Sequence, residues 1–336
     1  MTTTSLTVHQ IARPTGFPTH DHFAFVEAPV PSPAPGTALV ENLYWSVDPY
    51  HREAMDSDEL WTLHAPMEGR TIGRVVESRD PGLREGEIVL HREGWRTHSL
   101  VTADTARRLP VFDGVPLSAH LGILGGTGLS AYVALTRIAR LRQGEDLFVS
   151  AAAGGVGTAT GRLARLLGAG RIVGSAGSAA KVAYLTEHVG YDAAFDYHDG
   201  PVAEQLAKAA PDGIDVFVDN VGGDHLEAAI ASLREYGRIA WCGAVGQYNS
   251  TGGAPAAPRN LFDVVGKSLR LEGFLVRNHR DAQEELYDLA VPHLRSGRLR
   301  SDETVVDGFD RIVDAFLGML RGRNTGKMLV RGTTAR

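Results

Sequence analysis

The spacing of hydrophobic residues divides the chain into two regions with different predicted secondary structure. Up to about residue 120, short apolar runs such as 37–47, 70–78 and 86–91 are separated by turns rich in Gly and Pro. This pattern predicts short strands in a mostly antiparallel, barrel-like domain. The Pro-rich segment 28–36 and the Gly- and Pro-rich segment 249–258 predict surface loops.

From Gly128 onward, helical and strand patterns alternate, beginning with a helical pattern over 128–141. The expected strands are 146–150, 171–175, 192–196, 214–219, 238–243 and 269–276, and the expected helices among them are 156–168, 179–190 and 225–237. Near-continuous apolar strands that alternate with amphipathic helices predict a parallel sheet covered on both faces. Six strands in this order predict a doubly wound nucleotide-binding domain.

The C-terminal segment has a mixed pattern. Helices are expected at 281–297 and 310–322, and strands at 303–309 and 326–331. We expect this segment to return to the N-terminal domain and complete it.

A Gly-rich segment, AAAGGVG at 151–157, follows the strand predicted at 146–150 and begins a helix. Gly154, Gly157 and Gly161 share one helix face because their spacings are three and four. Glycines there let the helix approach the strand and let backbone amides approach a pyrophosphate. Because Ala151 replaces the first Gly of the usual motif, a tight turn without a ligand is the alternative.

The next strand indicates which dinucleotide is bound. NAD-binding domains place an acidic residue about 20 residues after the Gly-rich loop, where it binds the ribose 2′-hydroxyl. Between residues 171 and 187 there is no Asp or Glu, and Lys181 is present with Ser175 and Gly177 nearby. An ammonium group attracts a 2′-phosphate, which a carboxylate repels. We therefore predict NADP(H), with a solvated helix lysine as the alternative interpretation of Lys181.

Composition narrows the class of protein. Of the 336 residues, 43% are hydrophobic and 22% charged, and the formal net charge is −6. This charge disfavours nucleic-acid and acidic-membrane partners. The single cysteine, Cys242, permits no intramolecular disulfide and no Cys-rich zinc site. Because no signal-peptide pattern or membrane-length apolar run is found, we expect a cytoplasmic protein.

Short motifs carry a family resemblance that covers nearly the whole chain: VDPY within 45–52, DNVGG within 213–223, QYN within 242–249 and NTGK within 324–330. The chain resembles the zinc-independent medium-chain dehydrogenase/reductases, in the group of prostaglandin, plant double-bond and bacterial curcumin reductases. The resemblance implies an α/β fold, with a Rossmann doubly wound parallel sheet (123–289) inserted in a GroES-like β-barrel catalytic domain (1–122 plus 290–336). It also implies a homodimer.

The resemblance further implies which residues contact the cofactor. Those at the pyrophosphate and the 2′-phosphate are Gly154, Gly155, Val156, Gly157, Ser175, Gly177, Lys181 and Tyr197. Those nearer the nicotinamide are Asn220, Cys242, Gly243, Ala244, Gln247, Tyr248, Phe274, Leu275, Val276 and Asn324. Tyr50 is expected to line the substrate pocket, with a buried interdomain tyrosine as the alternative. Gly126–Thr127 and His51 depart from the family pattern, which leaves substrate preference open.

The chemistry expected is reduction of a carbon–carbon double bond. The 13 histidines show no paired ligand spacing, and no catalytic zinc is predicted. Without a Lewis acid, deprotonating an alcohol near neutral pH is difficult, whereas an enone or enal accepts hydride at its β-carbon. Tyr248 is expected to donate a hydrogen bond to the developing enolate oxygen; packing against the nicotinamide is its alternative role.

Three other functions remain open: a zinc-free quinone reductase, a non-catalytic NADPH-binding protein and, least favoured, a zinc alcohol dehydrogenase. His51 and Arg52 could meet a substrate carboxylate, although an internal ion pair is favoured for Arg52.

Overall fold

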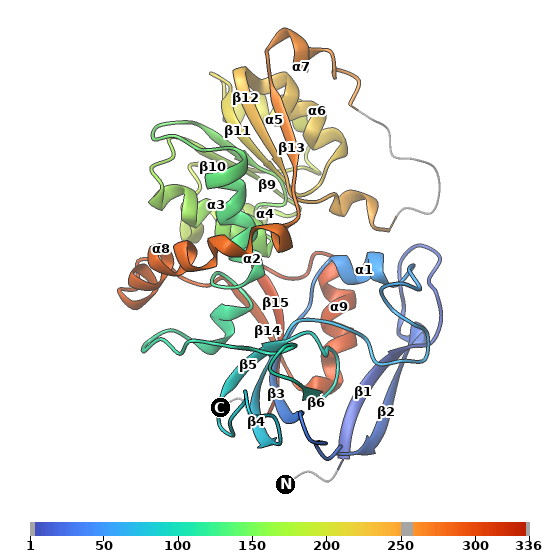
Figure 1. Cartoon of the computed structure of the whole chain (residues 1–336). Coiled ribbons are helices and arrows are strands. Elements are labelled where there is room, and N and C mark those ends of the chain that lie inside the picture. The colour runs from blue at the N-terminus through green and yellow to red at the C-terminus, as the bar shows by residue number, and fades with distance from the viewer. Residues whose placement is uncertain (1–3, 250–257, 334–336) are drawn as a thin grey trace. The chain divides into compact units, whose positions relative to one another are not determined.

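The computed structural model describes residues 4–249 and 258–333, so the loop expected at 249–258 lies almost entirely outside the described residues (Figure 1). The chain divides into two compact units. The first consists of Met1–Leu121, Thr304–Asn324 and Met328–Arg336, and the second of Gly122–Glu303 and Thr325–Lys327. In the described part of the chain, no helix has the length and apolarity needed to cross a membrane.

The first unit is built on antiparallel strands. β1 (Thr4–Gln10) pairs with β2 (Phe23–Pro29), which extends into the segment expected to be a loop. The larger sheet has the order β14-β15-β3-β4-β5-β7, with β6 paired to β3. Its strands are β3 (Ala38–Ser46), β4 (Thr71–Ser78), β5 (Ile88–His91), β6 (His98–Val101), β7 (Arg107–Arg108), β14 (Glu303–Asp307) and β15 (Lys327–Arg331).

Two helices accompany these strands: α1 (Tyr50–Ala54) and α9 (Ile312–Leu320). An aromatic cluster joins the beginning and the end of the chain. Trp45 on β3, Trp95 and Phe316 on α9 are almost completely buried in one core. The rings of Trp95 and Phe316 meet edge to face with centroids 5.6 Å apart. The C-terminal segment therefore packs against the N-terminal strands.

The second unit contains a six-stranded parallel sheet in the order β10-β9-β8-β11-β12-β13 (Figure 1). Its strands are β8 (Leu147–Val149), β9 (Ile172–Ala176), β10 (Ala193–Asp196), β11 (Ile214–Asp219), β12 (Leu233–Trp241) and β13 (Arg270–Gly273). Its helices are α2 (Gly126–Val133), α3 (Gly155–Leu166), α4 (Ala179–Tyr184), α5 (Val202–Ala209), α6 (Gly223–Ser232), α7 (Asp263–Gly266) and α8 (Gln283–Arg295). This strand order is that of a doubly wound dinucleotide-binding domain, which confirms the predicted fold class.

Both faces of this sheet are covered. Phe148 and Phe217 stack on one face, in the same core as α5 and α6. Val149 and Val218, which alternate with them, are also fully buried on the opposite face. Near-continuous apolar strands are therefore explained by burial on both sides.

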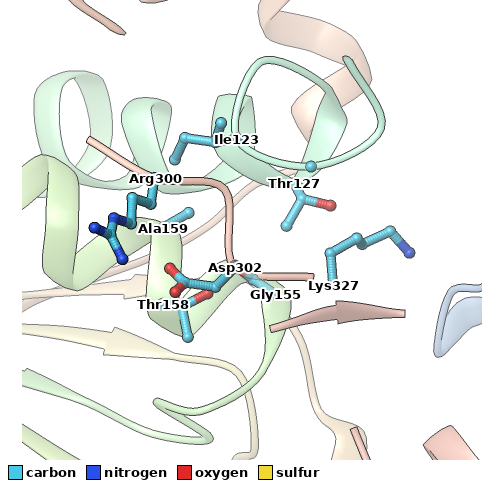
Figure 2. Close-up of a pocket in the computed structure, with 9 residues that line it drawn as sticks. Ile123, Thr127, Gly155, Thr158, Ala159, Arg300, Asp302 and Lys327 are labelled. Carbon is cyan, nitrogen blue, oxygen red and sulfur yellow. The ribbon is translucent and has the colours of Figure 1, made fainter. Parts of the chain in front are cut away.

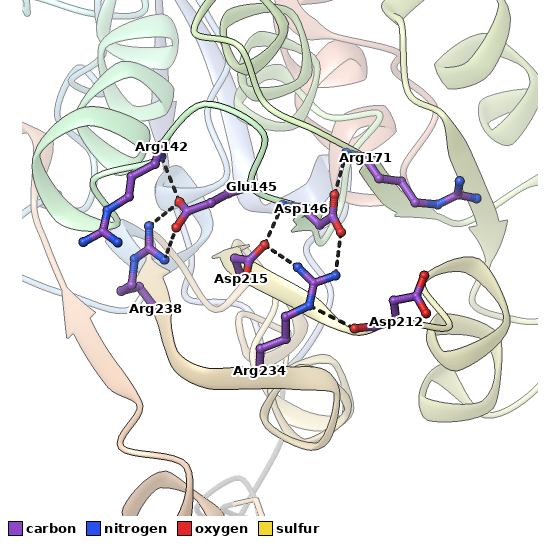
Figure 3. A network of polar contacts seen from close by, with 8 residues as sticks. All are labelled: Arg142, Glu145, Asp146, Arg171, Asp212, Asp215, Arg234 and Arg238. Atoms are coloured by element: carbon purple, nitrogen blue, oxygen red, sulfur yellow. Dashed lines mark hydrogen bonds and ion pairs between the residues drawn. The ribbon is translucent and has the colours of Figure 1, made fainter.

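Ion pairs join the ends of the strands at the edge opposite the Gly-rich loop (Figure 3). Arg234 bonds to Asp146 at 2.7 Å and to Asp215 at 2.5 Å, at the amino ends of β8 and β11. Beside them, Arg238 donates to both carboxylate oxygens of Glu145. This network links the amino ends of β8, β11 and β12.

Some predicted boundaries were wrong. The helix expected at 225–237 ends at Ser232, because Leu233 turns extended and pairs with Ile214 of the neighbouring strand. The helix expected at 128–141 begins at Gly126 and ends in a wider π-helical turn over Ala134–Ile138.

The division between the units also lies later in the chain than the expected boundary near residue 290. α8 belongs to the second unit, where Glu285 accepts a hydrogen bond from Tyr132 of α2 and pairs with Arg137.

Candidate functional site

The Gly-rich loop lies between β8 and α3. Ala151 has a positive φ of 48°, a left-handed conformation that favours glycine. Gly154 precedes the first helical residue, and its amide donates to the carbonyl of Ala151 at 2.9 Å. A Cβ on Gly157 would lie 2.4 Å from the carbonyl oxygen of Ala152. Only glycine therefore permits this close turn, which leaves the first amides of α3 without partners inside the helix.

Gly161 has a different role from the loop glycines. A Cβ there would lie 2.3 Å from the ring of Tyr191, whose hydroxyl donates to the carbonyl of Gly157 at 2.8 Å. Gly161 thus lets α3 approach the sheet across a tyrosine. The three glycines of the predicted helix face therefore have two roles. Gly154 and Gly157 form the loop, and Gly161 allows close packing against Tyr191.

The end of β9 carries no carboxylate. Ser175 is fully buried, and its hydroxyl has no hydrogen-bond partner among the described residues. Ser178 begins α4, and its side chain accepts from the amide of Lys181. Burial lowers the pKa of Lys181. This edge therefore offers a hydroxyl and a half-buried amine.

Tyr197, just after β10, lies against the same edge. Its hydroxyl is 2.9 Å from the place where a Cβ on Gly177 would be, so glycine leaves room for the phenol. The ring packs on His198 at 4.1 Å and meets His225 edge to face at 5.6 Å. The structure thus brings Gly177 and Tyr197 together, and their contact with a cofactor stays a prediction.

A buried carboxylate organises the turn after β11. Asp219 accepts hydrogen bonds from the hydroxyl of Ser150 at 2.8 Å and from the amides of Val221 and Gly222. Burial raises the pKa of Asp219, although these hydrogen bonds oppose the rise. The Asn220 side chain donates to the carbonyl of Ser150 at 2.8 Å. The turn is therefore fastened to the strand that precedes the Gly-rich loop.

The role of Asp219 was missed in the sequence, although an Asp followed by glycines is the known signal for such a turn.

The segment 242–248 is fastened to the same turn. The amides of Cys242 and Gly243 donate to the backbone carbonyl of Asp219. Desolvation raises the pKa of the Cys242 thiol to about 12, which keeps it protonated at neutral pH. The Tyr248 hydroxyl lies 3.6 Å from the position of a Cβ on Gly243, so Tyr248 folds back over its own loop.

The other residues of this unit that were predicted to contact the cofactor are Gln247 and residues 274–276. Gln247 approaches Gly222, and its amide donates to the carbonyl of Ala244 at 2.9 Å. Phe274 follows β13, and its amide donates to the carbonyl of Trp241 at 3.3 Å. Leu275 is 53% exposed. Val276 begins a short 3-10 helix, Val276–Ala282.

Tyr50 and Asn324 belong to the other unit. Tyr50 accepts a hydrogen bond from Arg92 at 3.2 Å, and burial together with the charge of Asp48 raises its pKa. Asn324 is largely buried, directly before the segment that crosses to the second unit.

His51 and Arg52 are both buried in the first unit. His51 is enclosed by aromatic rings that include Trp61 and Trp95, so it is not placed to meet a substrate carboxylate. Arg52 pairs with Asp56 at 2.8 Å, as expected for an internal ion pair.

The residues of the second unit fit a phosphorylated dinucleotide. The turn around Gly157 would be filled by any Cβ, and the amides that begin α3 suit a pyrophosphate. The hydroxyl of Ser175, which has no partner in the part of the chain that the structure describes, and the absence of Asp and Glu between residues 171 and 187 suit a 2′-phosphate. A parallel doubly wound sheet with such a loop defines a dinucleotide-binding protein.

Within residues 4–249 and 258–333, no three His, Cys, Asp or Glu side chains gather in a group that could hold a metal ion. The absence of a catalytic zinc stays a prediction.

Comparisons with known proteins agree with this class. Residues 7–109 match a family model described as the N-terminal domain of oxidoreductase, and residues 155–291 match one described as zinc-binding dehydrogenase. The chain is 40% identical over 321 residues to prostaglandin reductase 1 of Rattus norvegicus, with 94% of this chain and 95% of the relative covered. It is 37% identical over 301 residues to 2-alkenal reductase (NADP(+)-dependent) of Nicotiana tabacum, with 87% and 86% covered.

Among solved structures, that of CurA from Vibrio vulnificus in complex with NADPH matches with a TM-score of 0.90 and 31% identity, covering 98% of this chain and 99% of that one. The chain belongs to the zinc-independent medium-chain dehydrogenase/reductases, as the motifs predicted. The names of the tobacco and Vibrio proteins specify the phosphorylated dinucleotide, in agreement with the predicted NADP(H).

Proposed function

We propose that this protein is an NADPH-dependent reductase of the carbon–carbon double bond in α,β-unsaturated ketones or aldehydes. The observation that carries the proposal is the edge of the parallel sheet, where the Gly-rich loop, Ser175, Lys181 and Tyr197 match the needs of a phosphorylated dinucleotide. The relatives named alkenal reductase and prostaglandin reductase support the reaction class.

In this proposal different residues of the second unit bind different parts of the cofactor. The amides of Gly154 to Gly157 bind the pyrophosphate at the start of α3. Lys181 and Tyr197 bind the 2′-phosphate. Asn220, the loop over 242–248 and residues 274–276 orient the nicotinamide end, and Asn324 also contacts the cofactor.

NADPH, when bound, supplies the hydride that the β-carbon of the substrate accepts. Negative charge then moves to the substrate carbonyl oxygen, which needs a hydrogen-bond donor. Tyr248 donates from its phenol hydroxyl and stabilises the enolate, at a typical value of about 2.7–4 kcal/mol for one such donor. Solvent then delivers the proton to the α-carbon. Tyr50 lines the pocket that receives the substrate.

Turnover of the Tyr248→Phe variant tests the catalytic role. We expect kcat/KM for a linear enone to fall about 100-fold, because the developing oxyanion loses its donor. The Kd for NADPH should stay within about twofold, and Tyr236→Phe, an exposed tyrosine on β12, serves as the matched control. Unchanged kcat/KM in Tyr248→Phe would remove the tyrosine from the mechanism.

A substrate panel tests the reaction class itself. NADPH oxidation should be fast with linear enones and enals, and the product should be the saturated carbonyl compound. Turnover confined to quinones, or firm NADPH binding without any turnover, would contradict the proposal.

We also infer that the protein is a homodimer in the cytoplasm. Light scattering of the purified protein measures its mass, and the mass of a single chain would contradict the dimer.

A further inference from the structure

A three-residue segment near the C-terminus is fastened to the Gly-rich loop. This segment, Thr325–Lys327, is here called the strap, and it belongs to the second unit although β15 begins within it. The amide of Gly326 donates to the carbonyl of Ala153 at 2.8 Å, and Gly154 and Gly326 form a parallel bridge. The strap therefore holds the part of the loop that immediately precedes α3.

The other side of the strap is fastened to Asp302. The amide of Lys327 donates to the backbone carbonyl of Asp302 at 2.8 Å. Gly326 has a positive φ of 69°, and a Cβ on it would lie 2.0 Å from that same carbonyl oxygen. The strap thus fits closely between Asp302 and the loop, and its position depends on where Asp302 is held.

Asp302 is held by two helices. Its carboxylate accepts from Nε of Arg162 at 2.5 Å and from Nη2 at 2.8 Å, the bidentate arrangement that gives strong, directional pairing. The hydroxyl of Tyr184 also donates to this carboxylate. Only 10% of the Arg162 side chain and 4% of the Asp302 side chain are exposed. Arg162 lies on α3 and Tyr184 on α4, so Asp302 joins both helices through its carboxylate and the strap through its backbone carbonyl.

The donors keep their protons at neutral pH. Burial and the hydrogen bond to Asp302 raise the pKa of Tyr184 to about 12. The pKa of Arg162 is raised as well, because hydrogen bonding and the charge of Asp302 outweigh the effect of burial.

The same residues line a small pocket beside the loop. Figure 2 shows the Asp302 carboxylate beside Thr158 of α3, with Gly155 and Lys327 at the same pocket. Within this unit the carboxylate therefore sits directly behind the first turn of α3. A shift of Asp302 would therefore displace the backbone amides at the start of α3, which the proposed function assigns to the pyrophosphate.

We propose that Asp302 is a positioning residue that sets cofactor affinity, by holding the strap against the Gly-rich loop. The inference rests on the proposed function, since it assigns the pyrophosphate to this loop. The loop contains Ala151 in a conformation that costs free energy, and such backbone persists only where its surroundings hold it. Losing the carboxylate would leave the Arg162 guanidinium buried without its partner and the strap less constrained.

Binding measurements on Asp302→Asn test this role with two ligands. NADPH carries the pyrophosphate, whereas adenosine 2′-monophosphate carries only the end that binds away from the loop. We expect the Kd for NADPH to rise about tenfold, which corresponds to about 1.4 kcal/mol, while the Kd for adenosine 2′-monophosphate stays within about twofold. The kcat at saturating NADPH should also stay within about twofold.

Two further variants make the test specific. Glu145→Gln breaks another bidentate Arg–carboxylate pair at the opposite edge of the sheet, and NADPH affinity should not change. Tyr184→Phe removes one hydroxyl but keeps the ion pair, and the Kd for NADPH should rise about two- to threefold. This milder variant decides the question if Asp302→Asn does not fold.

The proposal is overturned if NADPH affinity is unchanged in the folded variant, or if both ligands weaken equally. An equal effect of Glu145→Gln would also overturn it, because the loss would then follow general destabilisation. None of these binding measurements needs a substrate. A protein that binds NADPH but reduces no enone would therefore contradict the proposed reaction and leave this inference standing.

Discussion

Single residues explain why the loop and the end of β9 differ from those of an NAD-binding domain. The usual acidic residue is replaced by Ser175, Gly177 and Lys181, and Gly177 leaves room for the Tyr197 phenol. These differences change the charge and the shape of the edge together. In the proposed function these residues contact the ribose and not the reacting carbon, so we expect them to control which dinucleotide binds and not the reaction.

Replacing Lys181 with Ala tests whether this residue controls the choice between NADPH and NADH. A hydrogen bond to a charged group contributes about 1.5–3 kcal/mol, so the KM for NADPH should rise about 10- to 100-fold. The KM for NADH should hardly change, because NADH has no 2′-phosphate. Initial rates with both cofactors provide the measurement, and Lys208→Ala on α5 is the matched control. A parallel rise of both KM values would mean that Lys181 does not contact the 2′-phosphate.

The sequence contained the glycine spacing, the missing carboxylate and Lys181, and each depends on neighbours within about 30 residues of chain. The contact between Arg162 and Asp302 joins positions 140 residues apart, and no local pattern marks it. Asp219 lies between these cases, since its turn was readable from Asp-Asn-Val-Gly-Gly but its bond to Ser150 was not. Features that depend on residues close in sequence could therefore be predicted. The contacts that hold the Gly-rich loop from distant parts of the chain could not.

At the level of elements, helix ends were harder to predict than the fold class. Residues 225–237 have a continuous helical pattern, yet the chain leaves the helix at Ser232. Pairing of Leu233 with Ile214 decided this, and such pairing is a tertiary effect that outweighs local propensity. The doubly wound parallel sheet followed from the alternation of strands and helices, because parallel strands need crossover connections, which are usually helical.

The ion-pair network in Figure 3 joins the amino ends of strands β8, β11 and β12, and we expect it to stabilise the sheet. Arg234→Ala would remove its bonds to Asp146 and Asp215 and destabilise the protein by about 1–2 kcal/mol, since pairs within a network exceed isolated surface pairs. Urea unfolding measures this change. Arg259→Ala, which breaks an exposed pair with Glu227, should destabilise the protein clearly less than Arg234→Ala, because solvent screens exposed pairs. Equal losses in the two variants would show that the network adds nothing.

For the whole molecule, buried neutral histidines link stability to pH. Burial lowers the pKa of His91 to about 3, and burial likewise lowers the pKa values of His120 and His225 to about 4. In the unfolded chain these groups titrate near 6.5. Below that pH the unfolded state binds protons that the native state does not, so stability decreases as the pH falls from about 6.5 toward 4.

His225→Phe tests this linkage. His225 is buried, and its Nε2 has no partner among the described residues, so phenylalanine should fit without losing a hydrogen bond there. At pH 5 each such histidine costs about 2 kcal/mol. The difference in unfolding free energy between pH 7.5 and pH 5 should therefore shrink by about that amount. His188→Gln, an exposed histidine, should leave the difference unchanged. A variant with the wild-type pH dependence would contradict the assignment to His225.

The path of the chain between the two units has a consequence for exchanging domains between relatives. The second unit is not one continuous length of polypeptide, because Thr325–Lys327 joins it after the chain has already left at Glu303. A chimera with junctions only at residues 122 and 303 would combine a Gly-rich loop from one parent with a C-terminal strap from the other. Recombination that respects this fold must therefore transfer the short segment Thr325–Lys327 together with the long segment Gly122–Glu303.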